Sequence, residues 1–504
     1  MKINLTTDTL VWLRRDLRLE DNKAILKAQT IGQNFAICFV FDKNILDPLK
    51  SDPLSMKDSD GYTIDKRISF IYRSLQELDE KLKKIGSCLI LEYGFSDRVI
   101  PELVKTLQAK NLICSNDYEP SAISRDNKIK KIISKDLVSF ISVKDQCFYE
   151  KKEILSKSGN PYTVFSHYKK TWFEKFSSNY STNMHKEEIY LSRKILPIPN
   201  SKLFLFPKLN VMGFSTKSML PSNIKTGSSG AEMHLDEFLN KIDSYKLKRD
   251  FPSVNGTSYL SVHLRFGTIS IRQVIEKVLA NNTKLENLSE GSKTWLSELV
   301  WREFYMQILF NFPHVTKGCF KKNYDCIDWV SSKPLFHSWA MGRTGYPIID
   351  AGMRQLNQTG FMHNRLRMLT ASFLTKDFGI NWQKGERYFA LKLNDFDLSA
   401  NNGGWQWASS TGCDAQPYFR IFNPITQSKK FDPEGKYIKK YIPELKKLGS
   451  KYIHTPWLAP EDVLKKAGIN IGEDYPLPKV DHNTARTNTL QRYDSARKKS
   501  FTDL

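Results

Sequence analysis

The segment from Asn394 to Trp407 contains the residue types that point most directly to chemistry. It reads Asn-Asp-Phe-Asp-Leu-Ser-Ala-Asn-Asn-Gly-Gly-Trp-Gln-Trp. This mixture of acids, amides, glycines and tryptophans is too polar for a core helix and too aromatic for a solvated loop. It suits a planar, polar heterocycle that needs hydrogen bonds at its edge and flat side chains at its faces. The segment therefore predicts a binding site for such a group.

A second candidate is the helical segment that carries Glu298, Trp301 and Arg302. Spacings of three and four place a carboxylate, a large aromatic ring and a cation on one helix face. The segment 364–368, Asn-Arg-Leu-Arg-Met, repeats the arrangement with its first, fourth and fifth residues. Intrahelical salt bridges, with Arg stems covering a core, are the structural alternative.

A third candidate is the segment Thr257-Ser-Tyr-Leu-Ser261, which follows a turn and precedes a helix. Hydroxyl groups and unpaired N–H groups at a helix N-terminus favour negative charge, so they can bind a phosphate. Helix capping by Ser or Thr would give the same pattern. Spacing alone leaves both explanations open.

Short apolar segments and amphipathic segments alternate in the first 145 residues. The apolar ones are rich in β-branched and aromatic residues, as buried parallel strands are; they lie at 10–13, 35–41, 88–93, 111–114 and 138–143. Helical periodicity is found between them, at 21–28, 65–84 and 96–109. This order predicts an α/β domain with a doubly wound parallel sheet over residues 1–145. No G-x-G-x-x-G follows the first strand, so we expect no ordinary dinucleotide site there.

The remainder of the 504-residue chain is organised differently. Ser, Asn, Pro and Lys accumulate over 146–230, which predicts a long inter-domain connector on the surface. Helical periodicity then dominates, including the segments 292–310, 346–357, 364–378 and 383–393. We therefore predict a mostly α-helical domain over 231–480 and a basic C-terminal tail over 481–504.

The chain is strongly basic. It has 76 Lys and Arg against 54 Asp and Glu, a formal net charge of +22, and its pI is about 9.4. Such an excess favours an anionic partner such as nucleic acid, whose phosphates release counterions when basic side chains neutralise them. A basic surface that serves solubility would have the same composition.

Cysteine usage and hydropathy bear on location. The seven cysteines are scattered, with no C-x-x-C and no Cys and His pairs at zinc spacing, so we expect reduced thiols and no metal. The N-terminal residues are too charged for a secretory signal, and no apolar run approaches the ~18 residues of a membrane span. We expect an intracellular, cytoplasmic monomer with no membrane partner.

Several motifs taken together resemble those of the photolyase/cryptochrome family. They are Trp12-Leu-Arg-Arg-Asp-Leu-Arg18 with Asp21-Asn22, Thr257-Ser-Tyr-Leu-Ser261, Trp301-Arg-Glu-Phe-Tyr305, Thr344-Gly-Tyr-Pro347, Gly360-Phe-Met-His-Asn-Arg-Leu-Arg-Met368, Asp397 to Trp407, and Tyr418-Phe-Arg-Ile-Phe-Asn-Pro424. The resemblance covers nearly the whole chain and is closest to the class I cyclobutane pyrimidine dimer photolyases. It implies an N-terminal α/β antenna domain and a C-terminal helical domain that binds FAD.

The resemblance also implies which residues hold FAD. Positions that match the phosphate and ribityl ligands are Tyr245, Thr257, Ser258, Leu260 and Ser261, with Arg302 nearby. Asp395 and Asp397 would hydrogen-bond cofactor N–H or hydroxyl groups, and Arg367 would pair with Asp395. Asn401 matches the position facing flavin N5, where a neutral amide suits the reduced, anionic flavin and favours repair over signalling.

The implied partner is UV-damaged DNA, from which photolyases flip the damaged base out of the duplex. The residues that match the lesion pocket and the DNA contacts are Glu298, Trp301, Arg302, Asn364, Arg365, Met368, Trp407 and Gln427. Trp301 and Trp407 would form aromatic walls for the lesion. Arg365 and Gln427 would grip phosphates, which gives affinity with little sequence preference.

The implied activity is that of a light-driven carbon–carbon lyase. Blue or near-UV light excites reduced FAD, an electron passes to the dimer, the cyclobutane ring opens and the electron returns. Trp329, Trp382 and Trp405 match the tryptophan chain that reduces oxidised flavin. Two alternatives are a flavin photoreceptor of the cryptochrome type and repair of (6-4) photoproducts, which relies on histidines where this chain has Asn364 and Met368.

A second, antenna chromophore is an open question at the sequence level. Folate-binding relatives carry an Asn-Glu pair shortly after the Tyr-Glu of the fourth strand, whereas this chain has Tyr118-Glu-Pro-Ser-Ala122. Ser121 and Ala122 therefore stand where the polar ligands would be, so a pterin would lose its main hydrogen-bond partner. A deazaflavin, a second flavin and no antenna at all are the alternatives, and the extra residues between Asp42 and Asp65 lie near the expected cleft.

Overall fold

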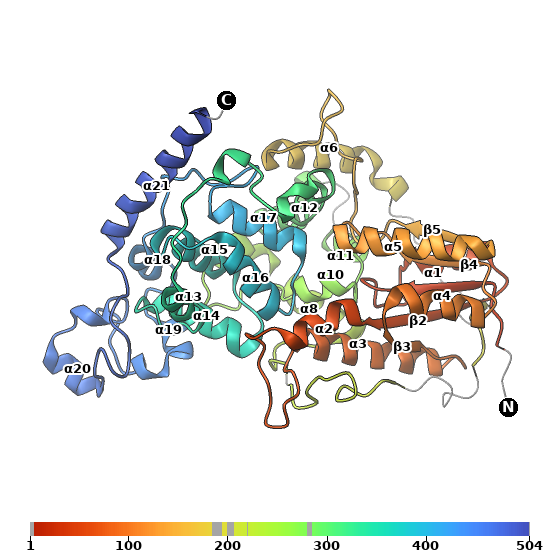
Figure 1. Ribbon diagram of the computed structural model, residues 1–504, viewed down its shortest axis with the longest axis horizontal. Helices are drawn as coiled ribbons and strands as arrows, with labels where there is room; N and C mark the ends of the chain where they lie inside the picture. Colours follow the sequence, from red (N-terminus) through yellow and green to blue (C-terminus); the bar gives the residue numbers. More distant parts are fainter. Residues whose placement is uncertain (1–4, 184–193, 199–205, 219, 280–284, 503–504) are drawn as a thin grey trace. The chain divides into compact units, whose positions relative to one another are not determined.

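The computed structural model describes residues 5–183, 194–198, 206–218, 220–279 and 285–502, with the backbone alone for 179–183 and 500–502. Internal contacts divide the chain into two compact units (Figure 1). Unit 1 comprises Met1–Pro161, His167–Asp243 and Ser258–Asn311, and unit 2 comprises Tyr162–Ser166, Ser244–Thr257 and Phe312–Leu504. Unit 1 thus groups 167–243 and 258–311 with residues 1–161, and the domain boundaries at 145, 230 and 480 stay predictions.

Unit 1 is built on a five-stranded sheet in the order β3-β2-β1-β4-β5, with all neighbouring pairs parallel. The strands are β1 (Thr9–Leu13), β2 (Phe35–Asp42), β3 (Ile90–Gly94), β4 (Asn111–Ser115) and β5 (Ser139–Val143). Every residue of β1 and β2 is buried, which explains why these segments are continuously apolar rather than alternating. The predicted doubly wound parallel sheet is confirmed.

The other long regular elements of unit 1 are helices. They are α1 (Lys23–Ile31), α2 (Lys43–Ser51), α3 (Lys66–Lys83), α4 (Ser96–Thr106), α5 (Pro120–Ile133), α6 (Phe165–Asn183), α8 (Gly227–Leu239), α10 (Ser261–Phe266), α11 (Ile271–Leu279) and α12 (Glu290–Asn311). Short 3-10 turns lie at Ser134–Asp136, Ile242–Ser244 and Leu285–Asn287.

Both faces of the sheet are covered because alternate strand residues point to opposite sides. On one face, Val11 and Ile37 pack with apolar side chains of α1 and α3. On the other face, Leu10 and Trp12 pack with side chains of α4 and α5. The two clusters form the core of unit 1.

The N-terminal motif Trp12–Arg18 lies at the end of β1, where its charged residues form buried ion pairs. Arg18 donates to both oxygens of Asp145 (2.7 and 2.8 Å), and Arg272 donates to the same carboxylate (2.8 Å). Burial alone would raise the pKa of Asp145, but the two guanidinium groups lower it below the ordinary value. Because the pKa is lowered on folding, the stabilisation is present above the unfolded value of about 3.9 and is lost as the pH falls through the folded pKa.

Unit 2 is almost entirely helical. Its helices are α9 (Tyr245–Lys248), α13 (Lys333–Ala340), α14 (Pro347–Thr359), α15 (Asn364–Ser372), a π-helical turn (Phe373–Asp377), α16 (Trp382–Lys392), α17 (Leu398–Ala408), α18 (Pro424–Phe431), α19 (Lys436–Tyr441), α20 (Glu461–Ala467) and α21 (His482–Thr502). Four 3-10 turns lie at Pro313–Thr316, Lys322–Tyr324, Pro443–Leu445 and Pro456–Leu458. The predicted mostly α-helical second part of the chain is confirmed.

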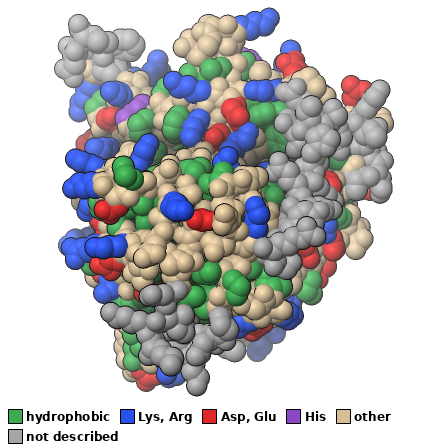
Figure 2. All heavy atoms as spheres, turned by 90° about the vertical axis from the view of Figure 1, so that its right-hand side faces the viewer, with side chains coloured by type: hydrophobic (Ala, Val, Ile, Leu, Met, Phe, Trp, Pro, Cys, Tyr) green, Lys and Arg blue, Asp and Glu red, His purple; other side chains and the backbone are tan. Residues whose placement is uncertain are grey.

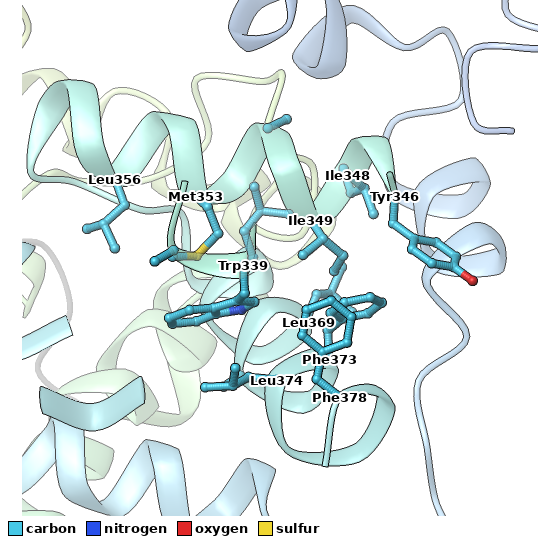
Figure 3. Close-up of a cluster of buried hydrophobic side chains, with 14 of the residues drawn as sticks. Trp339, Tyr346, Ile348, Ile349, Met353, Leu356, Leu369, Phe373, Leu374 and Phe378 are labelled. Carbon is cyan, nitrogen blue, oxygen red and sulfur yellow. The ribbon is translucent and has the colours of Figure 1, made fainter. Parts of the chain in front are cut away.

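One apolar cluster forms the core of unit 2. Figure 3 shows Met353 and Ile349 of α14 pointing toward Trp339 and toward Leu374 of the π-helical turn. Trp339 is fully buried, and its indole N–H donates to the carbonyl oxygen of Thr370 (2.9 Å). The core therefore fixes α13, α14 and α15 relative to one another.

The segment predicted as a basic tail is instead a packed helix. Thr489, Tyr493 and Ala496 of α21 are buried, at the four- and three-residue spacing of one helix face. His482 at its start pairs with Asp377 of the π-helical turn (2.6 Å). Burial is the main cause that raises the pKa of Asp377 to about 6. The composition of this segment is dominated by charged and polar residues, so it did not indicate that one face of the helix is buried.

On the face of the molecule that Figure 2 shows, basic side chains do not form a separate patch. Figure 2 shows one face of the molecule, on which Lys and Arg side chains lie among Asp, Glu and hydrophobic side chains.

Among the described residues, no helix is both long and apolar enough to cross a lipid bilayer.

We predict that replacing the shared carboxylate of the Arg18 and Arg272 pairs will destabilise unit 1. Asp145→Asn leaves the buried Arg18 guanidinium without its paired carboxylate and leaves Arg272 with Asp21 alone, which costs on the order of 3 kcal/mol in the free energy of unfolding. Urea unfolding at pH 7 measures the change. Asp136→Asn, at an exposed position with the same charge change, is the control. Equal stability of the Asp145 variant and the wild-type protein would contradict the assignment.

Candidate functional site

Helix α17 begins at Asp397 because this side chain caps it. One oxygen of the Asp397 carboxylate accepts hydrogen bonds from the backbone N–H groups of Ser399 (3.0 Å) and Ala400 (3.2 Å), and from the Ser399 hydroxyl. Such a cap satisfies donors that have no partner within the helix. It fixes the positions of the Asn and Trp residues over 401–407. Asp397 therefore has a structural role besides the predicted contact with a cofactor.

Arg367 and Asp395 form the predicted ion pair. Nη2 of Arg367 lies 2.8 Å from Oδ2 of Asp395, whose side chain is only 3% exposed. Nε of the same guanidinium donates to the carbonyl oxygen of Met362 (2.8 Å). A buried carboxylate is costly unless it is paired and hydrogen-bonded, so Arg367 allows a negative charge at this depth.

Several buried polar atoms between 394 and 405 have no hydrogen-bond partner among the described residues. They are both side-chain polar atoms of Asn394, Oδ1 of Asp395 and the indole nitrogen of Trp405. Buried polar groups are nearly always hydrogen-bonded, so a concentration of such atoms points to a polar ligand. Donors and acceptors are both present, which fits the polar edge of a flavin. Sequence reasoning did not single out Asn394, although it is the first residue of the motif.

The amides that follow the cap interact with α16. Asn401 donates to the carbonyl oxygen of Glu386 (3.0 Å), and Asn402 donates to the Glu386 carboxyl group (3.1 Å). Burial raises the pKa of Glu386 to about 7 against the opposing effect of the Asn402 hydrogen bond. A carboxyl group that titrates near neutrality therefore lies beside Asn401. No sequence motif indicated Glu386, because its pKa depends on tertiary burial.

The three predicted electron-transfer tryptophans all belong to the aromatic core of unit 2. Trp405 is 2% exposed and packs against Gly385 of α16 so closely that a Cβ there would lie 2.1 Å from its ring. Trp382 opens the same helix one turn earlier and is 1% exposed. Trp329 is half-buried, and its neighbour Val330 donates to the carbonyl oxygen of Gly379, just before α16.

A further tryptophan, which the sequence did not single out, touches this group. The ring centroid of Trp339 lies 5.9 Å from that of Trp405, at an interplanar angle of 72°. At the other end, the rings of Trp329 and Tyr493 meet edge to face at 6.3 Å. Trp405 and Trp329 thus belong to two separate groups of aromatic contacts, and Trp382 is buried in the same apolar cluster.

Residues predicted for the lesion and DNA contacts occupy several helices of unit 2. On α15, Nδ2 of Asn364 lies 3.9 Å from Sδ of Met368, so the two share a face as predicted. Arg365 is held by Asp250 (2.8 Å) and lies over the ring of Phe431 (4.4 Å). Trp407 on α17 and Gln427 on α18 are half-buried.

In unit 1, α12 presents Glu298, Trp301 and Arg302, all half-buried. The ring of Trp301 packs against Phe304 (5.6 Å) and Tyr305 (5.5 Å) on its own helix. Arg302 donates to the carbonyl oxygens of residues 146 (2.6 Å) and 264 (3.1 Å). These bonds hold the guanidinium in place, so Arg302 helps to position the surrounding chain.

Glu303, the neighbour of Arg302 on α12, anchors the helix from its other side. It is 2% exposed and accepts hydrogen bonds from the N–H of Phe148, the N–H of Tyr149 (3.2 Å) and the indole of Trp172 (2.7 Å). Burial raises the pKa of this carboxyl group. The position of Trp301 therefore depends on a buried acid that no spacing in the sequence marked.

The predicted phosphate-binding segment contains a strained backbone. Tyr259 has φ of +56°, in the left-handed region that residues with side chains seldom adopt. Ser258 Oγ accepts a hydrogen bond from the N–H of Leu260 (3.4 Å), and Ser261 begins α10. Such strain persists where the surrounding structure fixes it, often at ligand sites. Thr257, the first residue of the segment, belongs to unit 2, as does Tyr245, which is buried on α9.

The residues at the expected antenna position offer no carboxylate. Ser121 is exposed and Ala122 is buried, both in the first turn of α5. The Tyr118 hydroxyl donates to Glu150 (2.8 Å). Residues 43–51, within the extra segment, form α2.

Comparisons with known proteins agree with this arrangement. Residues 9–187 match the family model described as DNA photolyase, and residues 295–495 match the FAD binding domain of DNA photolyase. The chain is 35% identical over 500 residues to the deoxyribodipyrimidine photo-lyase of Vibrio cholerae, with 97% of this chain and 99% of that protein covered.

Two solved structures share the fold. The class III photolyase of Agrobacterium tumefaciens has a TM-score of 0.80 and 35% identity, with 98% of each chain covered. The Synechocystis cryptochrome has a TM-score of 0.81 at 24% identity, with 96% of this chain and 98% of that chain covered, and shows the fold alone. The fold and the site together therefore define a class of flavoprotein that has an α/β domain and a helical FAD-binding domain.

This chain belongs to the DNA photolyase family, and its C-terminal part is an FAD-binding domain of that family.

We predict that the buried Glu386 carboxyl group makes stability depend on pH. Its pKa is raised on folding, so the cost of ionising it is absent near pH 4.5, grows as the pH rises and is fully present above about 7. Glu386→Gln keeps the hydrogen bond to Asn402 and removes this cost. The variant should gain about 3 kcal/mol at pH 8, the free energy that corresponds to raising the pKa from 4.5 to about 7, and nothing at pH 4.5 in urea unfolding. Glu461→Gln, at an exposed position on α20, should show no such pH-dependent gain.

Proposed function

We propose that this protein is a deoxyribodipyrimidine photo-lyase that uses light to repair cyclobutane pyrimidine dimers in UV-damaged DNA, and that it acts as a monomer. The observation that carries the proposal is the buried set of unpartnered polar atoms over 394–405 beside the ion pair of Arg367 and Asp395. This set provides the hydrogen-bonding edge that a flavin requires. Membership of the photolyase family supports the same activity.

FAD fits the residues present, and we assign its ligands on that basis. Asp395, Asn401 and Asp397 would bind the polar edge and hydroxyl groups, with Arg367 paired to one oxygen of Asp395. The phosphate and ribityl ligands would be Tyr245, Thr257, Ser258, Leu260 and Ser261. To these we add Asn394, because both of its side-chain polar atoms are buried and without a described partner. Reduced FAD supplies the photoexcited electron that opens the cyclobutane ring.

The protein's own task is to bind and orient the lesion, and no general acid or base is needed for the chemistry. Trp301 and Trp407 would stack on the extruded pyrimidines, a contact that is worth about 1–3 kcal/mol per base in other proteins. Glu298 would hydrogen-bond the lesion, and Asn364 and Met368 would line its pocket. Asn401, as a neutral amide, adds no charge beside an anionic flavin.

The DNA backbone would be held by basic and amide side chains of unit 2. Gln427 is half-buried, and Lys429 and Lys430 on the same helix are exposed. Arg365 already pairs with Asp250, so a phosphate would have to compete with that carboxylate for the guanidinium. Trp405, Trp382 and Trp329 would carry an electron to oxidised flavin through the aromatic core.

The repair activity is tested directly with UV-irradiated oligothymidine. We expect illumination of the flavin-reduced protein to restore the thymine absorbance that dimer formation removed, whereas a sample kept in the dark shows no recovery. Irradiated DNA that carries only (6-4) photoproducts should not be repaired. No recovery with a fully reduced, flavin-loaded preparation would contradict the proposal and leave a photoreceptor role as the alternative.

Replacing Trp301 separates lesion binding from flavin binding. Trp301→Ala should weaken binding to dimer-containing DNA by about 1–3 kcal/mol, because it removes one stacking wall, while the bound flavin per chain stays unchanged. Equilibrium titration with fluorescent irradiated DNA measures the first quantity, and flavin absorbance the second. Trp457→Ala removes another half-buried tryptophan, which packs against Tyr346, and should leave lesion affinity unaltered. Loss of flavin from the Trp301 variant would place this residue in the cofactor site instead.

A further inference from the structure

Unit 1 contains a cavity that neither the proposed repair reaction nor the flavin site uses. It lies between α3 and the segment 208–218, and it has a volume of about 380 Å³. This volume falls within the range of about 300–1,000 Å³ typical of small-molecule sites. It exceeds what a simple inorganic anion fills, since it would hold roughly a dozen water molecules at ~30 Å³ each.

Both walls of the cavity are fixed by the fold. On α3, the lining residues Tyr72, Arg73 and Gln76 follow one helix face. The opposite wall is tied to the chain at Thr63, which accepts a hydrogen bond from the N–H of Ser215 (2.8 Å) and donates to the carbonyl oxygen of residue 213 (3.0 Å). The neighbouring Met212 and Phe214 are buried in the sheet core. The cavity is therefore bounded by anchored segments.

The described lining residues are rich in hydrogen-bond donors and contain no acidic side chain. Arg73 and Lys208 supply two positive charges, and neither side chain makes an ion pair or hydrogen bond with a described residue. Unpaired cations that share a cavity without a carboxylate make it attractive to an anion. Gln76 and Asn210 add amide groups that can bind polar substituents.

Ser218 gives an independent indication of a ligand. Its residue is 4% exposed, it lines the cavity, and its hydroxyl oxygen has no hydrogen-bond partner within the described part of the chain. A buried hydroxyl without a partner costs free energy, so a bound polar group would compensate it. The ring of Tyr72 provides an aromatic surface in the same cavity, and its contact with Phe206 (4.9 Å, edge to face) fixes its orientation.

We propose that this cavity is a binding site for a phosphate monoester of mononucleotide size. Arg73 and Lys208 bind the phosphate, Ser218 and the two amides bind polar groups of the body, and Tyr72 contacts its ring. The volume excludes free phosphate as the best-fitting occupant, and the absence of acidic lining residues disfavours a cationic one. The site is separate from the residues assigned to FAD and to the lesion, so it goes beyond the proposed repair activity.

Binding is tested with the purified, flavin-loaded protein and three probes: AMP, inorganic phosphate and adenosine. We expect AMP to bind with one saturable site by isothermal calorimetry, and its phosphorus NMR signal to shift on binding. Inorganic phosphate should bind at least about tenfold more weakly, because it fills only part of the cavity. Adenosine, which lacks the charge, should bind at least as weakly as phosphate.

Variants locate the site. Arg73→Gln combined with Lys208→Gln should weaken AMP binding by about tenfold or more, since hydrogen bonds to charged groups are lost. Ser218→Ala should weaken it by a smaller factor. The matched control is Lys84→Gln combined with Lys130→Gln, which removes the same charge at exposed positions of unit 1 outside the cavity lining. This control should bind AMP as the wild-type protein does.

Three results would overturn the proposal: no AMP binding by the wild-type protein, equal weakening in the cavity and control double variants, or adenosine binding as tight as that of AMP. Flavin content and the repair assay are measured on the same samples. Loss of repair in the wild-type protein would contradict the proposed function alone, whereas retained repair without AMP binding would contradict the cavity site alone. Arg73 and Lys208 are exposed, so we expect their replacement to leave the fold intact. Circular dichroism of the variants checks this.

Discussion

The free-energy cost of burying charged and polar groups governs the candidate flavin site. The Asp395 carboxylate lies almost fully out of water, and it is tolerated there because Arg367 pairs with one of its oxygens. Its other oxygen, the Asn394 amide and the Trp405 indole have no described hydrogen-bond partner. The described chain by itself therefore does not offset the free-energy cost of burying these polar groups. The polar edge of a cofactor would supply hydrogen bonds to these groups. The region is therefore a binding site that becomes complete when the cofactor is bound.

The cost of burying charge also accounts for the role of the motif Trp12–Arg18. This motif resembles that of the photolyase family, but in our proposal it stabilises the fold and takes no part in the chemistry. Arg18 and Arg272 share the buried Asp145 carboxylate, and through it β1 is joined to α11. On α12, Glu303 binds two backbone N–H groups and the Trp172 indole. These buried ions position α12, and with it the ring of Trp301. Family motifs here therefore mark scaffold residues as well as ligands.

Packing of aromatic side chains links the stability of unit 2 to its proposed electron path. Trp405 lies so close to Gly385 that any side chain there would displace the ring, which explains a glycine in the interior of α16 despite its low helix propensity. Trp382, on the same helix, is buried in the same cluster. Trp405 and Trp382 are close-packed in the core of the helical domain, and the half-buried Trp329 packs against that core.

The sequence by itself determined the strands, helices such as α3, α12 and α14, the two kinds of architecture and the motif 394–407, because these depend on local periodicity and residue type. It did not indicate α6, which lies within the segment predicted as a connector. It also determined the pairing of Arg367 with Asp395, through resemblance to a family. Only the tertiary structure decided which units the segments join, that the last residues form a packed helix, and that Asn394 and Glu386 belong to the site. Those features depend on burial and on contacts between residues that are distant in sequence. A side chain acquires a shifted pKa, or lacks a hydrogen-bond partner, only when folding has removed it from water.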